Sequence, residues 1–265
     1  MKFILKTMLL LLVSLSAMAD VVNPATVSEN TNETDQKVLK DIWKYEFSLG
    51  ASVYSGNQEF TLFTLNSKIS AQFPSHTVSI IPKLEYRQTD EEKLRKIDVT
   101  VNDVVDMKSL GNLQKNWGAF IDARYLKDDS KGIEHSTNTL VGIGYDFWGE
   151  YRGEGEALKL SVALGYRDQT NIDDSKEHFP FLSSRIKMLK PINKFTKFNV
   201  AAWHIASFKD FNRDYEASLE IGYENVLSKT TSVEVKQEST YENLPVEDRV
   251  RYNSISKIVF NWKPE

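Results

Sequence analysis

Apolar side chains occupy every second position over most of this chain, in runs separated by charged, Gly-, Pro- or Asn-containing breaks. In residues 215–223, for example, Tyr, Ala, Leu, Ile and Tyr alternate with Glu, Ser, Glu and Gly. Successive side chains of a β-strand point to opposite faces, so this alternation predicts strands with one apolar and one polar face. About twelve such runs follow one another, an even number, as in single-chain bacterial barrels. We therefore predict an all-β fold, an antiparallel transmembrane β-barrel over residues 43–265.

Two runs depart from the simple pattern. Pro82 interrupts the third run, and a bulge is expected there, because proline donates no hydrogen bond to the ladder and a closed barrel has no edge. The ninth run, residues 195–208, carries apolar residues in both phases, with Phe198 and Val200 in one and Trp203 and Ile205 in the other. The sequence leaves open which face of this strand is apolar.

The N-terminus has the composition of an export signal. Lys2 and Lys6 precede an apolar stretch, and Ala17-Met18-Ala19 forms a small-x-small cleavage site. We predict a signal peptide over residues 1–19, cleaved after Ala19, and a flexible polar periplasmic segment over residues 20–42.

No segment is long enough to cross a membrane as a helix, which requires about 18 consecutive apolar residues. Export without a membrane helix, followed by a barrel, predicts a location in the outer membrane of a Gram-negative-type bacterium. Outer-membrane lipid and the barrel assembly machinery are the partners expected there.

Aromatic residues bracket the apolar faces at a repeated interval of eight residues. The pairs are Trp117 and Tyr125, Tyr215 and Tyr223, and Tyr252 and Phe260. Eight residues of a tilted strand rise about 20 Å along the membrane normal, close to the height of the apolar band between two aromatic girdles. We therefore expect the apolar faces to meet lipid, and these aromatics, with Trp262, to lie at the membrane interfaces. The alternative is a soluble periplasmic β-barrel binding protein whose apolar faces point inward.

Charged side chains occupy the opposite faces, which predicts a charged lumen. The acidic residues expected to line it are Glu216, Glu220, Glu224, Glu234 and Glu238, and the basic ones are Lys83, Arg87, Arg124, Lys159, Arg167, Lys236 and Lys257. A tight turn over residues 225–229 would place Glu220 opposite Glu234, where like charges destabilise a sheet unless they are compensated. Because Lys236 and Lys257 offset only part of this charge, we expect an acidic wall and, if the barrel conducts, a mild cation preference.

Composition argues against several function classes. The chain carries 33 basic and 37 acidic residues, a net charge of −4, which disfavours nucleic-acid binding. It has no cysteine, which excludes disulfides and thiolate metal sites. The histidines also lack the spacing of a metal site, so no metal or cofactor is predicted.

One segment invites comparison with barrel enzymes of the phospholipase type, in which a His and a Ser share one lipid-facing strand face. In His135-Ser136-Thr137-Asn138, the serine lies on the face opposite the histidine. A nucleophile needs its base within hydrogen-bond reach, so no catalytic residue is predicted. A lipid-modifying barrel enzyme is kept as an alternative.

Several segments carry a resemblance to a known family. They are LGASVYSGN at 49–57, YLKDD at 125–129 leading into LVGIGY at 140–145, and LKLS at 158–161 leading into LGYR at 164–167. These segments resemble domain of unknown function 481, a family of uncharacterised outer-membrane barrels sometimes called salt-induced outer-membrane proteins. The resemblance implies a barrel without an assigned reaction. Together with the alternation it predicts a narrow, low-selectivity solute pore or a structural envelope protein.

The C-terminus departs from the usual pattern of outer-membrane barrels, which end on an aromatic residue that the assembly machinery recognises. This chain continues past Trp262 with Lys263-Pro264-Glu265. We expect Trp262 to take the place of the terminal aromatic residue, with a short overhang.

Overall fold

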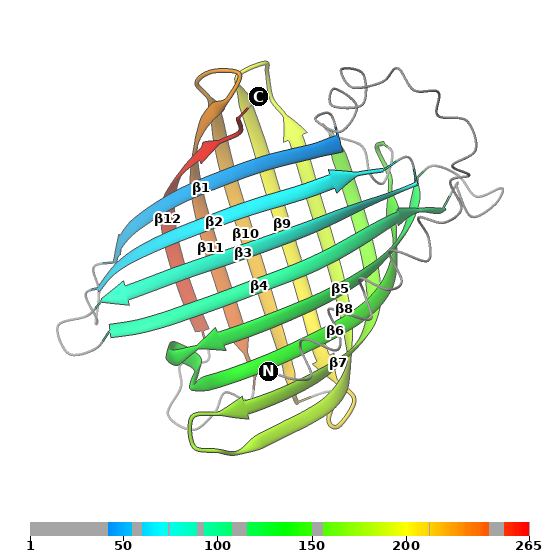
Figure 1. The fold of residues 1–265 in the computed structure, drawn as a ribbon, viewed down its shortest axis with the longest axis vertical. Coiled ribbons are helices and arrows are strands. Elements are labelled where there is room, and N and C mark those ends of the chain that lie inside the picture. Colours follow the sequence, from blue (N-terminus) through cyan, green and yellow to red (C-terminus); the bar gives the residue numbers. More distant parts are fainter. Residues whose placement is uncertain are drawn as a thin grey trace, which may run out of the picture. The chain divides into compact units, whose positions relative to one another are not determined.

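Twelve antiparallel strands follow one another along the chain and close into a barrel, in which β1 pairs with both β2 and β12 (Figure 1). The computed structural model describes residues 42–54, 60–73, 75–88, 93–107, 116–149, 156–211, 213–243 and 252–264. The strands are β1 (Trp43–Tyr54), β2 (Phe60–Gln72), β3 (His76–Gln88), β4 (Lys93–Asp106), β5 (Trp117–Asp128), β6 (Ile133–Asp146), β7 (Ala157–Asn171), β8 (Lys176–Pro191), β9 (Thr196–Ser207), β10 (Tyr215–Val226), β11 (Thr231–Glu242) and β12 (Tyr252–Trp262). The predicted twelve-stranded antiparallel barrel is confirmed.

The predicted signal peptide and all but the last residue of the polar segment lie outside the described residues. Within the described part of the chain, no helix is long and apolar enough to cross a membrane. One short 3-10 turn, η2 (Asp129–Lys131), joins β5 to β6.

The predicted bulge at Pro82 is wrong. Pairing between β2 and β3 is interrupted after Asn66–Lys83 and resumes at Ile69–Ile80 in the same register. The proline therefore leaves a gap in the ladder without inserting an extra residue, since a missing donor does not require the strands to slip. Register shifts occur instead beside η2, in the pairing of β5 with β6 and of β6 with β7.

The two faces of the barrel wall differ in polarity. Outward-facing Leu49, Leu164 and Ile258 keep 60%, 62% and 62% of their surface exposed. Inward-facing Phe181 and Ser136 keep only 1%. Soluble proteins do not expose a continuous ring of large apolar side chains, so this outer face is suited to lipid, as in transmembrane barrels.

The structure settles the phase of β9. Phe198 and Val200 lie opposite Tyr223 and Ile221, two exposed residues of the outer face of β10. Trp203 lies on the inner face, between Arg185 of β8 and Ser218 of β10. Residues 197 and 199 share that inner face, which adds a lysine and an asparagine to the lumen.

The barrel closes through a short seam. Five residue pairs join β1 to β12 in the described chain, from Phe47–Trp262 to Ala51–Ile258. The rings of Phe47 and Trp262 stack with centroids 5.7 Å apart, and the amide of Lys263 donates to the carbonyl of Thr230 at 2.7 Å. Trp262 is thus the last strand residue, and the overhang begins directly after it.

Inward-facing glycines make room for neighbouring side chains. A Cβ atom at Gly142 would lie 2.5 Å from both the Phe120 ring and the carbonyl oxygen of Val162. The backbone oxygen cannot move away as a flexible side chain would. At Gly50, which also faces inward, a Cβ atom would approach nothing closer than 3.4 Å.

We therefore expect Gly142→Ala to lower the free energy of unfolding by about 1–3 kcal/mol, the usual cost of overpacking. Gly50→Ala is the matched control and should leave stability almost unchanged. Urea unfolding in detergent micelles, followed by tryptophan fluorescence, measures both. Equal stability of the two variants would contradict the close approach of Phe120 and Val162 to Gly142.

Candidate functional site: the charged lumen

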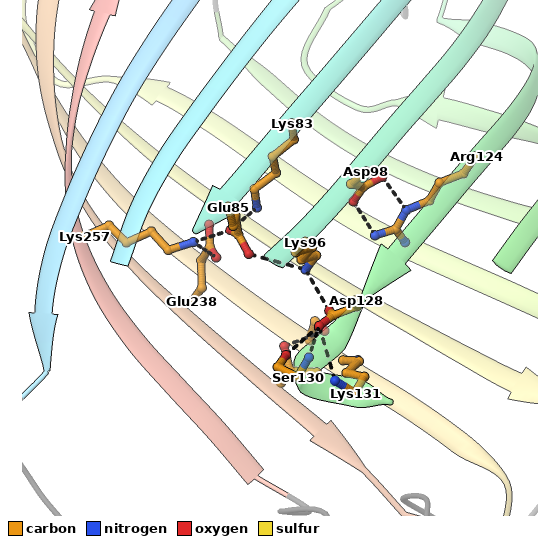
Figure 2. A network of polar contacts seen from close by, with 12 residues as sticks. Lys83, Glu85, Lys96, Asp98, Arg124, Asp128, Ser130, Lys131, Glu238 and Lys257 are labelled. Atoms are coloured by element: carbon orange, nitrogen blue, oxygen red, sulfur yellow. Dashed lines mark hydrogen bonds and ion pairs between the residues drawn. The ribbon is translucent and has the colours of Figure 1, made fainter. Parts of the chain in front are cut away.

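A chain of ion pairs crosses the inner face between β3 and β11 (Figure 2). Glu85 accepts from Lys83 at 2.9 Å and from Lys257 at 3.0 Å, and Lys257 also reaches Glu238 at 2.6 Å. Lys96 extends the chain, at 3.7 Å from Glu85. The Lys257 side chain is only 3% exposed, so its charge depends on these two carboxylates for solvation.

A second group of polar contacts lies where β5 turns into β6. Asp128 accepts from the backbone amides of Ser130 and Lys131 and thereby caps η2, while Lys96 lies 3.6 Å from the same carboxylate. Arg124 binds Asp98 through two hydrogen bonds of 2.9 and 2.6 Å. Figure 2 shows the Asp128–Lys96 and Arg124–Asp98 pairs pointing into the barrel beside Glu85.

Lys131 links opposite walls of the barrel. It projects from η2 and contacts Glu216 of β10, at 3.5 Å, and Glu242 of β11. In the ring of twelve strands, β5 and β11 are diametrically opposite. Burial disfavours the charge on Lys131, but Glu216 and Glu242 outweigh it and raise the pKa of the ammonium group above its usual value.

The predicted pairing register of β10 with β11, the two strands of the acidic wall, is wrong, because the turn between them lies farther along the chain. The observed pairs are Glu216–Glu242, Glu220–Glu238 and Glu224–Glu234, because the turn is centred on Lys229 and not on Leu227. Ser228 sets this position: its hydroxyl accepts from the amides of Thr230 and Thr231 at 3.1 Å each. A serine of this kind stabilises a tight turn, and Asn225 continues the strand.

Carboxylates still face each other in this register, yet most of them have a basic partner. The ion pairs are Glu216 with Lys131, Glu220 with Lys236 at 2.9 Å, Glu224 with Lys197 at 3.7 Å, and Glu238 with Lys257. Glu234 accepts from the Asn199 amide at 2.6 Å. Lys131 and Lys197, which had not been assigned to the lumen, supply two of these partners. The six inward carboxylates of β10 and β11 still meet only four lysines of the described chain, so the expected acidic excess is reduced and stays a prediction.

A family model for proteins of unknown function, DUF481, matches residues 47–261. The chain belongs to the DUF481 family. No curated protein matches it.

Solved structures similar to this DUF481 barrel are outer-membrane proteins. NanC porin superposes with a TM-score of 0.53 at 9% identity, covering 81% of this chain and 97% of the porin. An outer-membrane channel from Pseudomonas putida F1 gives 0.49 at 10% identity (84% and 94% covered), and KdgM porin in complex with disordered oligogalacturonate gives 0.46 at 10% (84% and 99% covered). The NanC similarity supports the fold, and at this identity it supports nothing more specific.

The remaining predicted lumen residues of the DUF481 barrel also lie on the inner face. Arg167 donates to Asn138 at 2.9 Å and lies over the rings of Phe179 and Phe181. Lys159 lies 3.9 Å from Asp146. Arg87 lies on β3, opposite Leu62.

Other inward-facing residues were not predicted from the sequence. They are Lys68, Lys131, Arg185, Lys187, Lys197, Phe179, Phe181 and Trp203. Arg185 and Lys187 could have been found, because they alternate with the apolar residues Leu182, Ile186 and Met188.

The predicted interface aromatics lie toward the two ends of their strands. Trp117, Tyr223, Phe260 and Trp262 are toward the end of the barrel at which odd-numbered strands begin, and Tyr125, Tyr215 and Tyr252 are toward the other. At the first end the Trp117 and Tyr145 rings are in contact, and at the second the rings of Tyr215 and Tyr241, with centroids 5.0 and 6.0 Å apart.

The His135 segment does not assemble a nucleophile and its base. His135 is exposed, Ser136 is buried on the inner face, and Thr137 donates to the carbonyl of Asp168 at 3.4 Å. Across the described residues, no group of three metal-ligating side chains comes together.

Proposed function

We propose that this barrel lies in the outer membrane and passes small solutes with low selectivity through its lumen, which the predicted acidic and basic residues line. The observation that carries the proposal is the contrast between the two faces: a ring of exposed apolar side chains outside and charged, paired side chains inside. A soluble binding protein would have the opposite arrangement. Ion pairs that cross the lumen, such as Lys131 with Glu216, would keep the pathway narrow.

Several finer features belong to the same proposal. The first nineteen residues would be removed as a signal peptide, leaving Asp20 as the mature N-terminus and residues 20–42 in the periplasm. The predicted aromatics would lie at the two membrane interfaces, and Trp262 would be recognised by the barrel assembly machinery. No catalytic role is proposed, and neither a metal nor a cofactor is needed.

Conductance in planar lipid bilayers tests the pore. We expect small, discrete current steps from the purified protein. Lys131→Ala should change their size, because it removes a side chain that bridges opposite walls. Lys263→Ala, which removes an exposed charge beyond the last strand, is the matched control and should leave the steps unchanged. The comparison also shows whether the current comes from this protein or from a contaminating porin.

A structural envelope protein is the second candidate, favoured by the same ion pairs across the lumen. Absence of current from folded protein would contradict the pore and support this role. Current that responds equally to both variants would also contradict the assignment of Lys131 to the conducting pathway.

A further inference from the structure

Four cations point into the barrel from two opposite walls, three from β7 and β8 and one from β2. Lys159 of β7 lies directly opposite Lys187 of β8, and Arg185 lies two residues along, opposite Ser161. Lys68 belongs to β2, which is diametrically opposite β8 in the ring of strands. Lys68 also faces inward, opposite Glu46, whose ion pair is with Lys263, so the four cations lie on both walls of the lumen.

These side chains face inward and are still accessible to solvent. Lys187 shares its strand face with Phe181, which is 1% exposed, and lies opposite Ala201, which is 4% exposed. Arg185, Lys187 and Lys68 are nevertheless exposed. An inward side chain with an exposed surface projects into open space within the barrel, where a solute could contact it.

Three of the four cations have no carboxylate of the described chain within ion-pair distance. In the described part of the chain, Arg185, Lys187 and Lys68 take part in no ion pair or hydrogen bond. The carboxylates whose charges reach them are engaged elsewhere: Asp122 accepts from Asn102, and Glu220 binds Lys236 at 2.9 Å. This contrasts with the remainder of the lumen, where most basic residues bind an acid.

Asp146, which pairs with Lys159, offsets at most one of the four charges. One of its oxygens accepts from the backbone amides of Trp148, Gly149 and Leu158 at 3.0–3.2 Å. Its other oxygen lies 3.9 Å from Lys159. This carboxylate mainly holds the β6–β7 turn, and its distance from Lys159 is at the limit of an ion pair.

Like charges that face each other across a sheet are destabilising unless something compensates them. Ammonium and guanidinium groups bind carboxylate and phosphate oxygens strongly, and an arginine can bind them in a bidentate manner. Ser161 and Ser183, on the same inner face, add hydroxyl donors. Clusters of Lys and Arg in a pore favour anions.

We propose that Lys68, Lys159, Arg185 and Lys187 form a lumen site for small solutes that carry several carboxylate or phosphate groups. Binding of such solutes does not require conduction, whereas the anion selectivity that the site would confer rests on the proposed pore. We expect an anion preference in place of the predicted cation preference, because Lys68, Arg185 and Lys187 have no ion-pair partner in the described chain, whereas most of the lumen carboxylates have one.

Two measurements on the full-length folded protein separate the site from the pore. Isothermal titration calorimetry in detergent at low salt, with inorganic pyrophosphate as the probe, reports binding alone. Planar bilayers in a KCl gradient report selectivity and block by pyrophosphate. The test variant is Arg185→Gln combined with Lys187→Gln, and the control is Lys190→Gln combined with Lys194→Gln, which removes the same charge from near the end of β8.

We expect wild-type protein to bind pyrophosphate, with affinity at least about tenfold weaker in the test variant, since charge-assisted hydrogen bonds are lost. Arg185→Lys alone should keep most of the affinity, because the charge remains. In bilayers, wild-type current should favour anions and be blocked by pyrophosphate, and the test variant should lose both properties. Unchanged heat-dependent mobility on gels would show that each variant is folded.

Each failure has a different meaning. The site would be overturned if wild-type protein does not bind pyrophosphate. It would also be overturned if the test variant binds pyrophosphate as tightly as wild type, because the bound anion would then be an adventitious ion only, held elsewhere on the protein. Binding that the test variant loses, without any current, would keep the site and overturn the pore. Current that favours cations in wild-type protein would contradict the anion selectivity.

Discussion

Replacing Lys257 by methionine is expected to destabilise the barrel by about 3 kcal/mol. Lys257 is 3% exposed and lies within 3.0 Å of both Glu85 and Glu238. Removing one partner from a buried ion pair leaves the other charge without compensation, which costs about 3–5 kcal/mol. The lower end applies here because Lys83 and Lys96 continue to neutralise Glu85.

Urea unfolding in phospholipid vesicles measures this effect. Lys263→Met is the control, because its ion pair with Glu46 is largely exposed and pairs of that kind contribute about 0–1 kcal/mol. Adding Glu238→Gln to Lys257→Met should recover part of the loss, since it removes a carboxylate whose remaining partner in the described chain, Lys236, lies at the longer distance of 3.5 Å. A Lys257→Met protein as stable as the wild type would show that the lumen is hydrated enough to solvate these charges without the pair.

An arginine at position 164 is expected to cost about 2–4 kcal/mol if the outer face meets lipid. Leu164 is 62% exposed and lies near the middle of β7, opposite Val141, which is 57% exposed. A charge at this depth is removed from water, whereas near the interfaces the cost falls to about 0–1 kcal/mol.

Thr137→Arg is the matched control for Leu164→Arg. Thr137 lies on the outer face of the adjacent strand, opposite the predicted interface aromatic Tyr125. Refolding titrations in lipid vesicles compare the two variants. A similar small effect at both positions would indicate that the apolar ring is not in hydrocarbon.

Most of the barrel wall could be predicted from the sequence, because its period of two reflects a physical requirement at every strand. Outward positions such as Leu164 must be apolar, and inward positions such as Glu220 are free to be polar. Where both faces of a strand carry apolar residues, the alternation does not identify the outer face. Trp203 fills space inside the barrel, so composition alone did not give the phase of β9.

The contacts within the lumen were harder to predict. The register of β10 with β11 depends on Ser228, whose hydroxyl accepts hydrogen bonds within the turn. Asn225, a residue type common in turns, lies within β10 instead. The partner of Glu216 is Lys131, from the opposite side of the ring. Such a contact depends on how the barrel closes and on its diameter. The alternation within each strand gives no information about either.

Fractionation of cells that express the full chain tests the central claim most directly. We expect the protein to sediment with the outer membrane, to resist extraction by alkaline carbonate, and to begin at Asp20 after processing. Recovery in the soluble periplasmic fraction would contradict the assignment of the exposed apolar ring to lipid, and with it the proposed pore.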